Sequence, residues 1–324
     1  MVLALLLAGC GRDAGESKEY AYVAAPQVTL RDRIAAVYNK VGTAKNGEQV
    51  EVLERSRRFV RVRTERNEEG WVEQRNLASE EVYKAFQELA KSHASDPVQA
   101  PGLARFNVNL HITPSRDGEK LYQLSEGEKL DLLERASTPK PVAQAAPKPG
   151  GKTQPPAMED WWLARASEGR VGWLLSRMVD VDIPLEVGQY AEGQRIVAFF
   201  VLNRVEDDGR KVPQYLVVLT EPKDGMPFDF NQIRVFTWNL KRDRYETAYR
   251  ERRLHGLLPV RAGTQTFENE GTLPVFSLRL KDASGNINER TYKLSGVLVR
   301  RVLAPGEKQP AEARRAPRRK RGRR

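Results

Sequence analysis

The chain contains an internal repeat, and this repeat limits its fold more than any other feature. The segment GEQVEVLER at 47–55 returns eighty residues later as GEKLDLLER at 127–135. Further along, RFVRVRT at 58–64 matches DWWLARA at 160–166 with an offset of 102. Self-similarity in this register predicts two copies of one structural module.

The second copy is longer than the first. The two copies span 20–80 and 104–182, and the offset between them grows from 80 to 102, which is an insertion of 22 residues. The inserted residues, 136–157, consist largely of Pro, Gly, Ala, Lys and Gln. This composition offers little to bury, so we predict a flexible, disordered loop.

Within each copy, polar and apolar residues alternate, which is the period of a half-buried β-strand. In the first copy, for example, Val50 and Val52 flank Glu51. About five such short strands, separated by Gly-, Asn- and Asp-rich turns, would leave sheet edges exposed unless the sheet closes on itself. We therefore predict a small β-barrel for each copy.

Each copy resembles a bacterial Src-homology-3 domain, whose pattern includes a Gly-led strand and a later Gly-Trp-apolar element. The matching residues are Val28–Leu30, Gly47–Leu53, Phe59–Val62, Gly70–Val72 and Leu77 in the first copy, and Val108–Leu110, Gly127–Leu133, Trp161–Ala164, Gly172–Leu174 and Val179 in the second. The resemblance implies a binding module. The first loop, which lines the ligand groove in many members of that family, departs from the family pattern in both copies, as LRDRIAA and LHITPSR.

The chain opens with an apolar run that ends at its single cysteine, in Leu7-Ala8-Gly9-Cys10. Such a run is too short to cross a bilayer and is typical of an export signal. It resembles the lipobox of bacterial lipoproteins, which implies a signal at 1–10, a lipid on Cys10, a tether at 11–19 and a place in the bacterial cell envelope, anchored to a membrane. The alternative is an apolar N-terminus with a stray thiol, because no Lys or Arg precedes the run.

The linker at 81–103 begins inside a predicted helix, which spans 79–95. Ser79 is suited to its N-cap, and Val82, Phe86 and Leu89 recur at helical spacing. The apolar stripe is narrow, so we expect a spacer that packs on a barrel rather than a helix that binds a partner.

The region at 185–303 shows the period of β-strands throughout, with tight polar turns and no helical period. We predict strands at 195–205, 214–220, 232–240, 244–252, 275–282 and 292–302. This pattern favours an antiparallel β-sandwich or barrel, and we recognise no family for it. The predicted fold class is therefore all-β: two small barrels joined by a short helix, then a third β-rich domain and a disordered tail at 304–324.

The tail carries most of the chain's excess charge. Residues 311–324 contain eight basic residues and one acidic residue, in a chain of net charge +11. The basic residues are Arg314, Arg315, Arg318, Arg319, Lys320, Arg321, Arg323 and Arg324. Such a block stays disordered and binds polyanions: anionic lipid or wall polymers outside the cell, or nucleic acid if the protein is cytoplasmic.

The sequence offers no pattern that predicts catalysis, a cofactor or a metal site. The three histidines, His93, His111 and His255, stand alone, and the only thiol belongs to the lipobox. A Cys-His hydrolase, the enzyme class often fused to this barrel family in cell walls, therefore has no nucleophile in this chain. We expect a protein that is not an enzyme.

Four tryptophans are the candidates for ligand contact: Trp71, Trp161, Trp162 and Trp173. Trp71 and Trp173 follow a glycine at equivalent positions and are expected mainly in the core, or at the floor of a groove. Adjacent strand residues point to opposite faces. One of Trp161 and Trp162 is therefore expected outside the barrel core, either exposed as a contact site or covered by the insertion.

Three hypotheses about function remain open. The first is a lipid-anchored envelope protein whose barrels bind a wall peptide, a glycan or another envelope protein. The second makes the barrels targeting modules for an auxiliary or degenerate enzyme domain at 185–303. The third is a nucleic-acid binder that acts through the basic tail.

Overall fold

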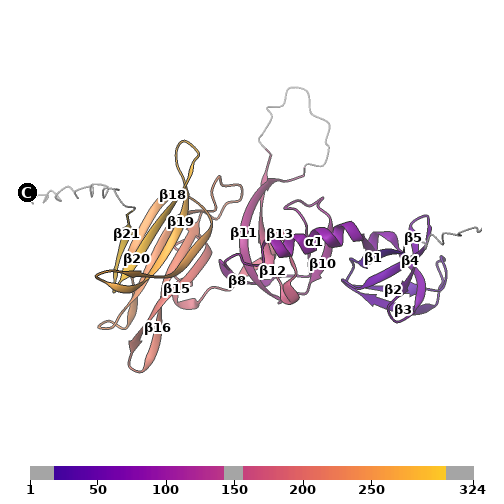
Figure 1. The fold of residues 1–324 in the computed structure, drawn as a ribbon, viewed down its shortest axis with the longest axis horizontal. Coiled ribbons are helices and arrows are strands. Elements are labelled where there is room, and N and C mark those ends of the chain that lie inside the picture. Colours follow the sequence, from indigo (N-terminus) through magenta and orange to yellow (C-terminus); the bar gives the residue numbers. More distant parts are fainter. Residues whose placement is uncertain (1–17, 142–155, 304–324) are drawn as a thin grey trace, which may run out of the picture.

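The computed structural model describes residues 18–141 and 156–303, and it consists of three antiparallel sheets of seven strands each, arranged in a row (Figure 1). The predicted all-β class is confirmed. Cys10, the tether, most of the insertion and the basic tail lie outside the described residues.

The first two sheets have the same topology. The first sheet, called the first barrel below, contains β1 (Glu19–Val23), β2 (Gln27–Arg31), β3 (Lys40–Lys45), β4 (Gln49–Ser56), β5 (Phe59–Thr64), β6 (Glu69–Glu73) and β7 (Leu77–Ser79). The second barrel contains β8 (Ala100–Ala104), β9 (Val108–His111), β10 (Lys120–Leu124), β11 (Lys129–Pro139), β12 (Met158–Arg165), β13 (Val171–Leu175) and β14 (Val179–Val181). The strand orders of the two sheets are β3-β2-β6-β5-β4-β1-β7 and β10-β9-β13-β12-β11-β8-β14. Each strand of the first barrel therefore has its counterpart seven strands later in the chain.

The register of the strands follows the sequence repeat. In the first barrel Val52 lies opposite Val62, and in the second Leu132 lies opposite Ala164, with a bulge directly after each pair. Gly47 and Gly127 have φ angles of 79° and 78°, a region open to glycine at no steric cost. The two copies therefore fold alike.

Two parts of the sequence prediction need correction. Each barrel has seven strands rather than about five, because β1, β3 and their counterparts β8 and β10 carry too little apolar alternation to be recognised. Residues 136–139, which composition assigned to the disordered insertion, belong to β11 and pair with the start of β12 up to Pro139–Met158. Backbone pairing with β12 holds these residues in a strand despite their low β-strand propensity.

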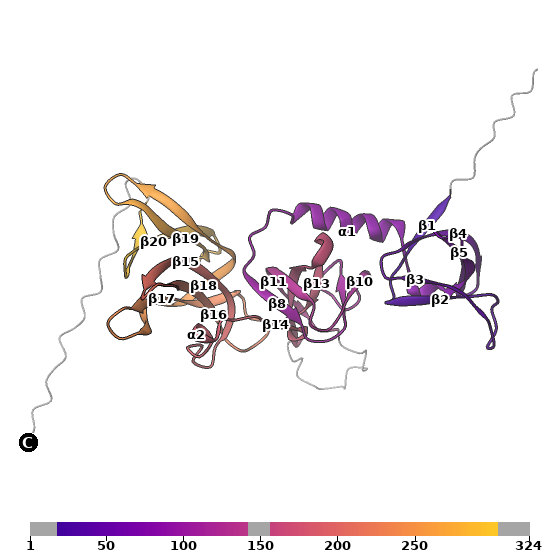
Figure 2. The ribbon, with the colours of Figure 1, turned by 90° about the horizontal axis from the view of Figure 1, so that it is seen from below.

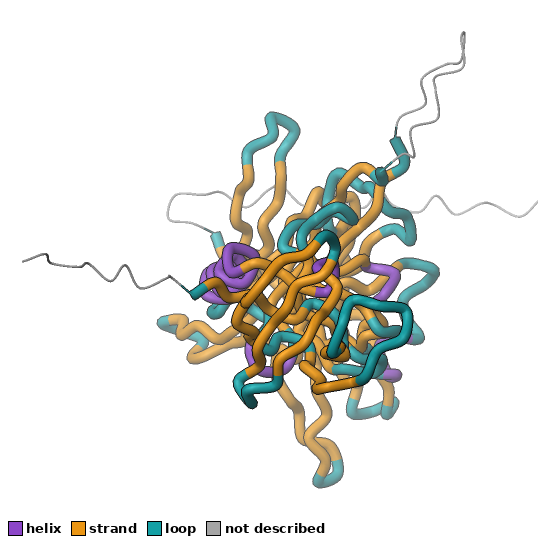
Figure 3. Tube along the Cα trace, turned by 90° about the vertical axis from the view of Figure 1, so that its right-hand side faces the viewer, coloured by secondary structure: helices purple, strands orange, loops and turns teal. Residues whose placement is uncertain are grey.

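The helix between the barrels is confirmed. Helix α1 spans Glu80–Ser92, and the Ser79 side chain caps it by accepting from Val82 N. Tyr83 stacks on Tyr22 of the first barrel at 3.9 Å between ring centroids, and Phe86 is buried in the core of the second barrel. The helix therefore packs on both barrels, along one side of the row (Figures 2 and 3).

The third sheet is a single antiparallel meander in chain order. Its strands are β15 (Arg195–Asp207), β16 (Arg210–Thr220), β17 (Phe230–Asn239), β18 (Arg244–Phe267), β19 (Gly271–Lys281), β20 (Ile287–Ser295) and β21 (Leu298–Val302). β15 also contacts β18 and β19, so the sheet curls on itself. A four-residue helix, α2 (Leu185–Gly188), joins this sheet to the second barrel.

The second barrel and the third sheet share one hydrophobic core, whereas the core of the first barrel is separate. Gln99 is fully buried between the second barrel and the third sheet, where its side chain bonds to both the backbone N and O of Val260. The first barrel is held instead by α1 and by Asn46, which bonds to the backbone of Leu121 and Gln123. These contacts leave much of the first barrel's surface open.

Candidate functional site

The structure buries both members of the tryptophan pair. Trp162 is 3% exposed and faces the core of the second barrel, and Trp161 is 1% exposed against the ring of His111, 5.5 Å away. Trp161 lies outside the core clusters of the second barrel, as the alternation of strand residues predicts, but it is fully buried beside His111 of β9. Neither ring offers an open surface to a ligand.

The other two tryptophans are half-buried. Trp173 packs against a small cluster with Leu133 and Leu163, beside α1. Trp71 lies on the outer face of the first barrel, opposite Arg31 on one side and Arg61 on the other. Trp71 is thus the one candidate of the four that borders an open face.

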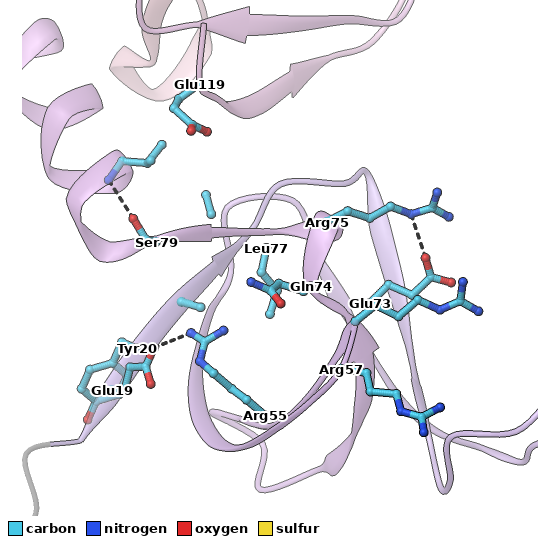
Figure 4. Close-up of a pocket in the computed structure, with 14 residues that line it drawn as sticks. Glu19, Tyr20, Arg55, Arg57, Glu73, Gln74, Arg75, Leu77, Ser79 and Glu119 are labelled. Atoms are coloured by element: carbon cyan, nitrogen blue, oxygen red, sulfur yellow. Dashed lines mark hydrogen bonds and ion pairs between the residues drawn. The ribbon is translucent and has the colours of Figure 1, made fainter. Parts of the chain in front are cut away.

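A cleft with a volume of about 910 Å³ lies on the first barrel, and Val82 of α1 and Glu119 of the second barrel also line it. Four arginines line it, Arg55, Arg57, Arg58 and Arg75, and we call it the arginine cleft. Figure 4 shows Gln74 and Leu77 in its middle, with Glu19, Tyr20 and Arg55 on one side and Arg57, Glu73 and Arg75 on the other.

Local structure explains why the arginines gather there. Arg55 lies near the end of β4, and Arg57 and Arg58 form the two-residue turn between the paired residues Ser56 and Phe59. A tight turn projects both side chains outward, and Arg57 has a φ of 52°. Arg75 lies in the 3-10 helix η1 (Gln74–Asn76), whose first N–H bonds to the Arg58 carbonyl.

Two of these arginines are paired with carboxylates and two are not. Arg55 forms an ion pair with Glu19, and Arg75 Nε lies 2.7 Å from Glu73 Oε2. Among the described residues, no acidic side chain pairs with Arg57 or Arg58. The Arg58 guanidinium lies over the Phe59 ring instead, at 5.5 Å.

The equivalent positions of the second barrel show a different charge pattern. The repeat places Arg135 at the position of Arg55 and Arg177 at that of Arg75. It places the acids Glu159 and Asp160, however, at the positions of Arg57 and Arg58. At two equivalent positions the second barrel thus has carboxylates and the first barrel has arginines.

In the second barrel these acids neutralise their neighbours. Glu159 accepts from Arg116 and from Arg177, and the Arg116 guanidinium lowers the pKa of the Glu159 carboxyl. Asp160 pairs with Arg135, and the two side chains are only 2% and 5% exposed.

The third sheet and its loops cover this face of the second barrel. Gly225 N donates to Asp160 Oδ1 at 3.0 Å, and Arg135 Nη1 donates to the backbone oxygen of Asp229 at 2.8 Å. Burial lowers the pKa of the Arg135 guanidinium and raises that of the Asp229 carboxyl. The part of this face around Arg135 and Asp160 is therefore a closed domain interface in the second barrel, whereas Arg177, the counterpart of Arg75, stays exposed beside a cleft of about 470 Å³.

The first loop of the first barrel adds an exposed apolar edge. Ile34, Val37 and Tyr38 are 41%, 85% and 37% exposed. The Arg31 guanidinium lies 4.3 Å from the Tyr38 ring centroid and also reaches Glu73 at the rim of the cleft. The same loop in the second barrel is polar and is tied down by Arg116.

The histidines have structural surroundings. His93 Nδ1 lies 2.6 Å from Asp96 Oδ2, His111 contacts the backbone oxygen of Gly118, and His255 packs on Phe228. Across residues 18–141 and 156–303, no group of three or more His, Cys, Asp or Glu residues is placed to hold a metal ion.

The comparisons with known proteins agree with the fold of the first barrel. Residues 28–78 match the bacterial SH3 domain family. The chain therefore carries a bacterial SH3 domain, and the second barrel repeats its strand order. No curated protein matches the sequence.

Similar solved structures include two proteins from Trichomonas vaginalis and one from Bacillus cereus. NlpC2 from Trichomonas vaginalis is 9% identical with a TM-score of 0.19, and the match covers 85% of this chain and 97% of that one. NlpC1 from the same organism is 9% identical with a TM-score of 0.18, covering 89% and 92%. An NlpC/P60 family protein from Bacillus cereus is 11% identical with a TM-score of 0.23, covering 83% and 93%. TM-scores this low carry no argument about this chain.

No helix in the described part of the chain has the length and apolar character needed to cross a bilayer.

The sequence reasoning missed the arginine cleft, although a signal for it was present. The aligned copies read Arg57-Arg58 against Glu159-Asp160, a reversal of two charges inside an otherwise similar module. A charge reversal between repeats indicates a face that serves different partners, and it could have been read before the structure was known.

Proposed function

We propose that the protein is a non-enzymatic binding protein of the bacterial cell envelope in which the first barrel binds the ligand. The second barrel acts as a rigid connector to the third sheet. The single observation that carries this proposal is the contrast between two equivalent faces: the arginine cleft is open, whereas its counterpart around Arg135 and Asp160 is buried against the third sheet.

The charges of the cleft select the class of ligand. Arg57 and Arg58 lack acidic partners among the described residues, so the cleft attracts anionic groups. Lipidation of Cys10 would hold the cleft near the envelope surface, and the basic tail, including Arg314 and Arg324, would add attraction to anionic lipid or wall polymers. The ligand in this proposal is an anionic component of the envelope, either a wall peptide or another envelope protein.

Retention on purified envelope material tests the proposal. Replacing Arg57 and Arg58 by Gln in the full chain should lower the retained fraction at low salt, and added salt should lower retention of the wild type. Arg253→Gln is the matched control, because Arg253 is also exposed, lies at a φ of 60° and is far from the cleft in sequence. Equal retention of the cleft variant and the wild type would refute the proposal.

A further inference from the structure

The arginine cleft is lined by four arginines and three glutamates, Glu19, Glu73 and Glu119, and two of its arginines form no ion pair within the described residues. Glu19 and Glu73 provide one carboxylate each for Arg55 and Arg75. The remaining pair, Arg57 and Arg58, meets no acidic side chain of the described chain.

The second barrel shows which groups neutralise arginines at the equivalent positions. There, two neighbouring carboxylates, Glu159 and Asp160, accept from Arg177 and Arg135. They are adjacent in sequence, and β12 directs their side chains to opposite faces, so each meets a different arginine. In the first barrel the counterparts of these two arginines, Arg55 and Arg75, pair with Glu19 and Glu73 instead. Two further arginines stand at the positions of the two carboxylates.

The second barrel also shows what kind of molecule covers this face. The segment from Gly225 to Asp229 lies against it and bonds through backbone groups to Asp160 and Arg135. The occupant of the equivalent face is thus a polypeptide loop, which supplies both hydrogen-bonding backbone and apolar side chains.

The lining of the arginine cleft fits an occupant of the same kind. Its rim carries guanidinium groups, and its floor includes Ala21, Leu77, Ala78 and Val82. A phosphate polymer would satisfy the rim but would leave the apolar floor unused. A peptide with two neighbouring carboxylates beside an apolar residue would satisfy both.

We propose that the arginine cleft binds a protein segment that presents two neighbouring carboxylates beside an apolar side chain. The ligand's carboxylates pair with Arg57 and Arg58, the two cleft arginines that have no ion-pair partner among the described residues. This inference rests on the proposed function and names the ligand class of its site.

Peptide titration of the full chain, followed through the arginine Nε resonances by NMR, tests this inference. The probe is the peptide acetyl-GSGEDLGSG-amide, and its control is the same peptide with Gln-Asn in place of Glu-Asp. Exposed ion pairs are worth about 0.2–1 kcal/mol each, so two to four of them should make the acidic peptide bind about tenfold more tightly than its control.

Two variants make the test specific. Arg57→Glu combined with Arg58→Asp installs the charges of the second barrel and should abolish the preference for the acidic peptide. Arg57→Lys combined with Arg58→Lys keeps the charges and should preserve most of it. Arg57 and Arg58 are exposed turn residues, so the variants should fold, and an unchanged thermal midpoint would show it.

Two outcomes would overturn the inference. One is equal binding of the acidic and the control peptide. The other is a clear preference of the cleft for polyphosphate or for phosphatidylglycerol vesicles over the acidic peptide. If either occurs while the Gln variant still loses retention on envelope material, the proposed function stands and only the ligand class is wrong.

Discussion

Gln99 joins the second barrel to the third sheet, and its replacement by Leu should weaken that interface strongly. Val260 lies where the register of β18 and β19 shifts, so its backbone groups bond to Gln99 instead of to the neighbouring strand. The distances are 3.1 Å from Gln99 Nε2 to Val260 O and 2.8 Å from Val260 N to Gln99 Oε1.

The magnitude follows from the groups left without partners. Leu has no donor or acceptor, so both the N–H and the C=O of the fully buried Val260 would lose their bonds. Each such loss costs about 1–3 kcal/mol, or about 2–6 kcal/mol for the two. The unfolding midpoint of the unit formed by the second barrel and the third sheet should therefore fall by at least about 4 °C.

Differential scanning calorimetry and hydrogen exchange at Val260 together measure this effect. Gln214→Leu is the matched control, because Gln214 is 2% exposed and its Oε1 has no hydrogen-bond partner among the described residues. Removing an unsatisfied group should be neutral or stabilising. If Gln99→Leu leaves both the midpoint and the exchange rate at the wild-type level, the assigned interface does not hold the two units together.

Four further substitutions test other parts of the chain. Leu132→Asp should place an unpaired carboxylate in the core that the second barrel shares with the third sheet, and so unfold both. Hydrogen-exchange profiles should show that the first barrel stays folded. Val52→Asp should destabilise the protein less, because Val52 is only half-buried. The pKa of Glu159 is lowered in the folded state, so its stabilisation is present above the unfolded-state pKa and is lost as the pH falls through the folded-state pKa. Glu159→Gln should therefore destabilise the protein at pH 7, and the difference from the wild type should shrink as the pH falls below the ordinary Glu pKa of about 4.3. Cys10→Ser should abolish incorporation of labelled palmitate, and labelling that persists would contradict the lipobox prediction.

The repeat made much of the fold predictable, and its limits have physical causes. Strands such as β4 and β5 alternate clearly, and Ser79 marks the start of α1 with a side chain suited to capping. The first strand of each barrel was missed because its backbone pairing, rather than its residue pattern, makes it a strand.

The site was less predictable than the fold. The tryptophan pair was a candidate because adjacent strand residues face opposite ways, and nothing local in the sequence reveals that Trp161 is buried beside His111. The arginine cleft needs Arg55, Arg57 and Arg75 brought together from three elements, which depends on the closure of the barrel. The burial of Arg135 depends on the docking of another sheet, which no residue of the repeat encodes by itself.

The central claim is that the face around Arg55 and Arg57 is open for binding in the first barrel, whereas its counterpart around Arg135 and Asp160 is closed in the second. Modification of arginine by phenylglyoxal, quantified by mass spectrometry in the free and the envelope-bound protein, tests it most directly. We predict that Arg55, Arg57 and Arg75 react in the free protein and are protected in the bound protein, while Arg135, at 5% exposure, is unreactive in both. Cleft arginines that react equally in both states, with protection confined to other parts of the chain, would contradict the claim.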